Sequence, residues 1–129
     1  MRQLRRLKQT KVKEITIRPR IVTKDGEGVP VVSWGDPFTV KGEIWPATSS
    51  RQIEQYGDRV SGIQNALIEG DYTLANISGV LTLTRADGQI IRLGDGVCVY
   101  NGANQDPDYE VLSIRETDPL RLEIEVRYG

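Results

Sequence analysis

Alternation of hydrophobic and polar residues runs through most of the chain and predicts a β-rich fold. The clearest stretch is residues 120–126, where Leu120, Leu122, Ile124 and Val126 alternate with charged residues. Because successive side chains of a strand point to opposite faces, this period of two predicts one face on a core and one face in solvent. The charged residues on the predicted solvent face are Arg121, Glu123, Glu125 and Arg127.

The N-terminal part of the chain shows the same period. Residues 14–22 place Ile15, Ile17, Pro19 and Ile21 on one face. Proline cannot donate a hydrogen bond to a sheet, so Pro19 indicates an edge position. Turn residues separate this stretch from two further strand candidates, at residues 29–34 and 38–45.

Turn residues also divide the C-terminal half into short strands. The segments at 80–84 and 89–93 flank Ala86-Asp87-Gly88 as a hairpin, and residues 97–100 and 109–114 follow. We therefore predict an all-β fold: a small β-barrel of about seven or eight mostly antiparallel strands.

Residues 46–71 interrupt this pattern and predict a long excursion from the barrel. Ser49 and Gln52 have the spacing of a helix N-cap and its capping-box partner, and Gly57 supplies a stop. We expect a short helix at residues 50–56, followed by a strand near residues 66–69. Excursions of this length in a compact domain are more often functional than idle.

Composition narrows the possible chemistry. A chain of 129 residues with 38% hydrophobic and 27% charged residues has the size of one domain, which we place at residues 14–129. The absence of histidine excludes histidine-based catalysis and histidine-ligated zinc or iron. A single cysteine excludes an internal disulfide framework and a metal site with several thiolate ligands. No apolar run reaches the ~20 residues that span a bilayer. We expect no enzyme activity, no cofactor, no metal, no small-molecule substrate and no membrane partner.

Positive charge is concentrated at the N-terminus. Residues 1–13 contain no acid, whereas the other 116 residues sum to −7. The basic residues of this arm are Arg2, Arg5, Arg6, Lys8, Lys11 and Lys13. Such an arm is either a flexible, solubilising terminus or a contact for an acidic protein or for DNA phosphates.

Other candidate sites carry weaker signals. Gly94-Asp95-Gly96 lacks the spacing of a phosphate-binding loop and predicts a tight turn. Asp106 and Asp108 are too few to hold calcium, which needs about six or more oxygen ligands. Cys98 lies in an alternating strand and is expected to be buried and inert. The residues Trp34, Trp45, Arg51, Tyr56 and Arg59 could stack single-stranded bases, although packing of both tryptophans on the barrel rim is the simpler expectation.

The order of several turn and strand segments carries a resemblance that spans residues 14–126. The segments are Ile17-Arg18-Pro19-Arg20, Lys24-Asp25-Gly26-Glu27-Gly28, Trp34-Gly35-Asp36-Pro37, Lys41-Gly42-Glu43-Ile44-Trp45-Pro46, Ser49-Ser50-Arg51 and Tyr56-Gly57, then Gly94-Asp95-Gly96-Val97 and Asp108-Tyr109-Glu110-Val111. In this order they resemble the head-closure proteins of tailed phages and prophages, also called stoppers or head-tail connector proteins.

The resemblance implies a function and a set of partners. Proteins of this family are small β-barrels that form a ring beneath the portal and its adaptor, close the channel after DNA packaging and dock the tail. The resemblance therefore implies a homo-oligomer of six or twelve copies in the virion neck, assembled in the bacterial cytoplasm. Its other partners would be the portal-adaptor protein, a tail terminator or tail-completion protein and, transiently, packaged DNA.

The resemblance also points to a site. In this family a loop from the barrel reaches the channel, and residues 46–71 are its counterpart here. The candidate channel or partner residues are Thr48, Ser49, Ser50, Arg51, Gln52, Tyr56 and Arg59. Two other functions remain open at this point: a nucleic-acid-binding barrel of the OB type, and a tail terminator or other neck protein.

Overall fold

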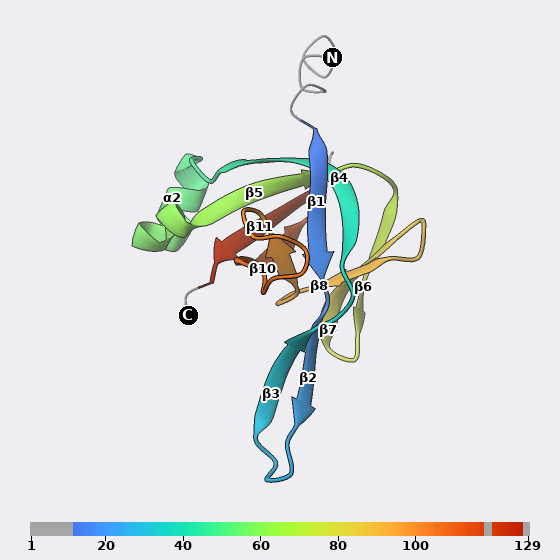
Figure 1. The fold of residues 1–129 in the computed structure, drawn as a ribbon. Coiled ribbons are helices and arrows are strands. Elements are labelled where there is room, and N and C mark those ends of the chain that lie inside the picture. Colours follow the sequence, from blue (N-terminus) through green and yellow to red (C-terminus); the bar gives the residue numbers. More distant parts are fainter. Residues whose placement is uncertain (1–11, 118–119, 128–129) are drawn as a thin grey trace.

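Six antiparallel strands close into a barrel that forms the body of the protein (Figure 1). The structure is a computed structural model that describes residues 12–117 and 120–127. Around the barrel the strands follow the order β1-β4-β5-β11-β10-β9. Their bounds are Lys13–Arg18 for β1, Phe38–Pro46 for β4, Ile63–Ile68 for β5, Gly96–Cys98 for β9, Tyr109–Arg115 for β10 and Leu120–Val126 for β11. The predicted small all-β barrel is confirmed.

Five more strands and a helical segment extend from this barrel. Strands β2 (Arg20–Lys24) and β3 (Pro30–Trp34) form a hairpin that projects away from it (Figure 1). Strands β6 (Tyr72–Ile77), β7 (Val80–Arg85) and β8 (Ile90–Arg92) form a separate sheet. Helix α2 (Ser50–Tyr56) continues into the 3-10 helix η2 (Gly57–Gly62). The described residues therefore hold eleven strands, more than the seven or eight predicted.

Alternating apolar side chains fill the barrel interior. Ile15, Ile17, Leu122 and Ile124 are almost fully buried, as their period of two predicts. Leu83 of β7 and Ile91 of β8 are also fully buried and belong to the same hydrophobic cluster. The β6–β7–β8 sheet therefore packs on the barrel through one face. No helix in the described part of the chain is long and apolar enough to cross a membrane.

Gly42 lets strands β4 and β5 approach closely. A Cβ atom at this position would lie 2.1 Å from the carbonyl oxygen of Leu67 and 3.0 Å from Cδ1 of Ile15. Only glycine fits such an approach without a shift of the backbone.

The prediction of one strand at residues 14–22 is wrong in one respect. The chain leaves the barrel at Pro19, so that β1 and β2 belong to different sheets. The guanidinium of Arg18 braces this point by donating to the carbonyl oxygens of Gly35, Trp34 and Gln105 at 3.0–3.1 Å. Because β2 lies beyond the barrel, Ile21 is 41% exposed rather than inward-facing.

The predicted excursion at residues 46–71 is also too long. The barrel resumes at Ile63, and β5 pairs with β4 on one side and β11 on the other. Every residue of β5 is buried or half-buried, and Gln52 of α2 contacts Asn65 on its outer face. The strand therefore lacks the alternation that identifies a half-buried strand. The excursion proper is therefore limited to residues 47–62.

Candidate functional site

The helical excursion is built as its sequence predicts. The backbone N–H of Gln52 donates to Ser49 Oγ at 3.1 Å, and the Ser49 hydroxyl donates to Gln52 Oε1 at 3.1 Å. Gly57 ends α2 with a φ of 57°, a conformation that favours glycine. The predicted helix at residues 50–56 is confirmed, with Ser49 as its N-cap and Gly57 as its stop.

Buried polar side chains hold α2 on the barrel. Gln52 Nε2 donates to Asn65 Oδ1 and to Glu123 Oε2, both at 2.7 Å. The Tyr56 hydroxyl donates to Glu123 Oε1 at 2.6 Å. The Ser113 hydroxyl also donates to Glu123, and Arg115 Nε lies 3.1 Å from Glu123 Oε1. Glu123 therefore joins the helix to strands β10 and β11.

The expectation that Glu123 faces solvent is wrong. It lies on the outer face of β11, as alternation requires, but the helical excursion covers that face and leaves the residue fully buried. Burial opposes its ionisation. Hydrogen bonds from Ser113, Tyr56 and Gln52 and the charge of Arg115 outweigh burial and hold the pKa of the Glu123 carboxyl at about 2. A carboxylate held this way is a structural anchor and a poor general base.

Arg59 adds an outer contact to this anchor. Its Nη2 and Nε atoms donate to the two carboxylate oxygens of Glu125 at 2.7 and 3.0 Å. Its guanidinium also lies 5.7 Å from the centre of the Tyr56 ring. The Arg59 side chain is 57% exposed, so this ion pair contributes little stability.

The seven candidate residues therefore fall into two groups. Ser49, Gln52, Tyr56 and Arg59 make contacts within the protein that fix the excursion. The other three, Thr48, Ser50 and Arg51, are exposed, and the neighbouring Ile53 is 52% exposed. Sequence reasoning missed Ile53, whose signal is an apolar residue on the solvent side of an otherwise polar helix.

The basic arm falls mostly outside the described residues. Arg2, Arg5, Arg6, Lys8 and Lys11 lie there, so their predicted partner contact stays a prediction. Lys13, assigned to the arm, is instead the first residue of β1 and pairs with Gly42. The barrel thus includes one residue that the predicted boundary placed in the arm.

The two tryptophans lie on different strands and have different contacts. Trp34 ends the hairpin and packs against the Arg127 guanidinium, 4.8 Å from the ring centre. Trp45 lies near the far end of β4, opposite Asn65 of β5.

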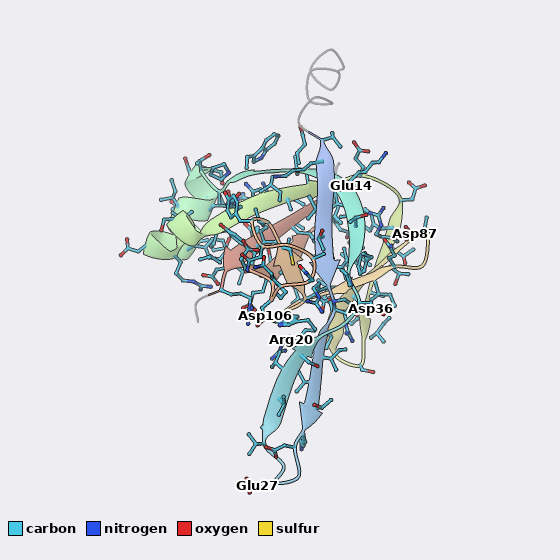
Figure 2. All side chains as sticks on the ribbon, viewed as in Figure 1. Glu14, Arg20, Glu27, Asp36, Asp87 and Asp106 are labelled. Atoms are coloured by element: carbon cyan, nitrogen blue, oxygen red, sulfur yellow. The ribbon has the colours of Figure 1, made fainter. Side chains whose placement is uncertain are left out.

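The projecting hairpin is the second candidate site, and sequence reasoning missed it. Its exposed apolar side chains lie on both faces of the ribbon: Val22 and Val32 on one, Val31 and Ile21 on the other. Figure 2 shows Glu27 at the far tip and Arg20 near the base, where the hairpin meets the barrel. Isolated two-stranded hairpins are marginally stable in water, and these apolar side chains form no core of their own.

Asp95 fixes the base of this hairpin. Its carboxylate is buried and accepts the backbone N–H groups of Arg20 at 3.0 Å and Arg92 at 2.9 Å. Burial raises the pKa of Asp95, and the two backbone hydrogen bonds oppose that rise. The predicted tight turn at this position is thus a structural joint between the hairpin and the β6–β7–β8 sheet.

The remaining chemical candidates have structural roles. Asp108 accepts the backbone N–H groups of Val99 at 2.8 Å and Tyr100 at 2.9 Å, which closes the loop between β9 and β10. Residues 12–117 and 120–127 contain no cluster of three or more potential metal ligands. Cys98 is buried, as predicted, and burial raises the pKa of its thiol.

Comparison of the chain with protein-family models, curated proteins and solved structures finds no match.

Proposed function

We propose that the protein is a structural subunit of a ring at the head–tail joint of a tailed phage or prophage particle. In this role it closes the portal channel after DNA packaging and offers a surface on which the tail docks. The proposal assigns it no catalytic step. The observation that carries it is the β2–β3 hairpin, which projects away from the barrel (Figure 1). It carries exposed apolar side chains on both faces.

The barrel suits a role as a scaffold. Its interior is occupied by packed side chains of the hydrophobic cluster, including Ile17, Ile124 and Val97. The surface elements, in contrast, carry exposed apolar residues such as Val32, Ile53 and Ile77. Among these, the exposed valines and isoleucine of the hairpin share one element, which favours it as the contact surface.

The excursion at residues 47–62 supports the channel-facing part of the proposal. Its fixed side is clamped through Glu123, so Ser50 and Arg51 are presented to a partner in a defined orientation. The order of segments along residues 14–126 resembles head-closure proteins, and this resemblance selects the phage neck among the possible assemblies.

Deletion of the gene from its phage or prophage, followed by electron microscopy of the particles, tests this function. We expect separate, mostly DNA-empty heads beside complete tails. Filled heads with aberrant or missing tails would move the protein to the tail side of the joint, as a terminator. Particles indistinguishable from wild type would overturn the proposal.

Complementation tests whether the loss of this gene alone causes the deletion phenotype. The wild-type gene supplied in trans should restore joined particles. The Ile53→Asp variant, which alters an exposed residue without touching the Glu123 contacts, should restore them less well if the excursion faces a partner.

A further inference from the structure

The loop between β9 and β10 contains an asparagine followed directly by a glycine, Asn101 and Gly102. Every residue from 101 to 106 is exposed to solvent. Asparagine is a thermolabile residue, because the backbone nitrogen that follows it can attack its side-chain amide. A following glycine makes this attack easiest, since no Cβ atom shields the nitrogen and the backbone turns freely. The pair is therefore a candidate for spontaneous chemical modification.

Both reacting groups of this pair are held in hydrogen bonds. The backbone N–H of Gly102 donates to Gln105 Oε1 at 2.6 Å. The side-chain amide of Asn101 donates through Nδ2 to the carbonyl oxygen of Asp106 at 2.9 Å. For the attack, the Gly102 nitrogen has to lose its proton, and the Asn101 side chain has to bring its Cγ atom to that nitrogen. Each hydrogen bond opposes one of these steps, so the folded loop slows the reaction.

We propose that Asn101 is a latent deamidation site and that the Gln105 side chain restrains it. Hydroxide removes the proton of the Gly102 N–H, and the resulting nitrogen anion forms a bond to Cγ of Asn101. The bond from Cγ to the side-chain nitrogen breaks, and this nitrogen takes a proton from water and leaves as ammonia. Water then opens the succinimide ring at either carbonyl and leaves aspartate or isoaspartate at position 101. This inference does not depend on the proposed function.

The side chain of Gln105 acts directly on the reacting nitrogen. An oxygen that accepts the Gly102 proton stabilises the protonated nitrogen and would repel the lone pair of the deprotonated one, so it disfavours the reactive form. The backbone of Gln105 makes separate contacts. Its N–H donates to the Gly102 carbonyl oxygen at 3.0 Å, and its carbonyl oxygen accepts Arg18 Nη1 at 3.0 Å. A substitution of the Gln105 side chain therefore removes the restraint and keeps both backbone contacts.

Deamidation changes the contacts and the charge of the loop. A carboxylate at position 101 cannot donate a hydrogen bond to the Asp106 carbonyl oxygen, so this contact across the loop is lost. The modified loop also gains a negative charge beside Asp106 and Asp108. Because the charge differs, ion-exchange chromatography separates the modified protein from the unmodified one.

Timed incubation at mildly alkaline pH, followed by peptide mass spectrometry, tests this inference. Wild type is compared with Gln105→Ala, which removes the accepting oxygen, and with the matched control Gln105→Glu, which keeps one. The measured quantity is the rate of amide loss at Asn101 relative to Asn104, which is exposed in the same loop but precedes a glutamine. We expect this ratio to exceed one in wild type and to rise about two- to tenfold in Gln105→Ala, the factor that one lost hydrogen bond supplies. In Gln105→Glu the ratio should not rise.

The outcomes separate the chosen site from its restraint. Amide loss at Asn104 as fast as at Asn101 in wild type would overturn the site. An unchanged ratio in Gln105→Ala would overturn the restraint, and so would faster loss at both asparagines, because that result reports a general loosening of the loop.

A further variant, Gly102→Ala, tests the attacking nitrogen. A Cβ atom at this position would come closest to Oδ1 of the exposed Asn104, at 3.2 Å, and Gly102 lies outside the left-handed region, so alanine is accommodated. Its methyl group shields the nitrogen, and we expect slower amide loss at Asn101. An unchanged rate, or a product without isoaspartate, would contradict the succinimide route.

Discussion

Gln52 Nε2 lies 2.7 Å from Glu123 Oε2, joining a helix residue to a barrel residue 71 positions away in the sequence. Both side chains are buried. A buried carboxylate requires partners for its charge, and here the helix supplies two of them, Gln52 and Tyr56. The helical excursion is therefore part of the folded body, with a clamped inner side and an exposed outer side.

Replacing Glu123 by glutamine tests this anchor. The variant keeps the shape of the side chain but removes the charge that Tyr56, Ser113 and Arg115 face. We expect a loss of about 2–4 kcal/mol in the free energy of unfolding, measured by urea denaturation. The matched control is Glu125→Gln, which removes the exposed pair with Arg59 and should cost about 0–1 kcal/mol. Equal losses in the two variants would contradict the anchoring role.

Stability should depend on Glu123 in a defined pH window. The pKa of its carboxyl is lowered from the ordinary 4.5 to about 2 in the folded protein. A group with a lowered folded pKa stabilises the protein above its unfolded pKa, and this stabilisation is lost as the pH falls through the folded value. The difference in unfolding free energy between wild type and Glu123→Gln should therefore shrink between pH 5 and about pH 2. A constant difference across this range would contradict the assignment.

Gly42 should be intolerant of a side chain. In Gly42→Ala the new methyl group would meet the Leu67 carbonyl oxygen, and strands β4 and β5 would have to separate. We expect a loss of at least about 1–3 kcal/mol in unfolding free energy, measured by urea or thermal denaturation. Gly26→Ala is the control, because no atom lies within 4 Å of its Cβ position, and it should change stability little. Comparable losses would show that the barrel adapts at Gly42.

The contacts of the two tryptophans bear on the alternative function, a barrel that binds single-stranded nucleic acid. Trp34 packs on the Arg127 guanidinium, whereas Trp45 lies on β4 opposite Asn65. Packing of each ring on the protein favours a structural role for both. We expect single-stranded oligonucleotides to leave tryptophan fluorescence unchanged at low salt. Salt-sensitive quenching that disappears in Trp45→Ala would favour the nucleic-acid-binding function instead.

Local patterns predicted the elements that depend on neighbours in sequence. The spacing of Ser49, Gln52 and Gly57 gave the correct helix, because caps form between residues three or four positions apart. The alternation of Leu120, Leu122 and Ile124 likewise gave the correct barrel strand. Both patterns involve only residues that lie within a few positions of one another in the sequence.

Elements that depend on distant packing could not be predicted in this way. Glu123 is buried because a helix far away in the sequence covers it. The alternation of residues within β11 contains no information about that helix. The exposure of Ile21 follows from the departure of the chain at Pro19 into a separate hairpin. Strand β6 was missed, although the Ser78-Gly79 turn, with φ values of 53° and 81°, is a two-residue hairpin signal that could have located it.

The most direct test of the central claim is to locate the protein in the assembled particle. Immunogold labelling of purified wild-type particles, with particles from the deletion strain as the control, reports where it resides. The proposed function predicts label at the joint between head and tail and none on heads, tails or control particles. Particles without specific label, or with label along the tail tube, would contradict a head-closure ring.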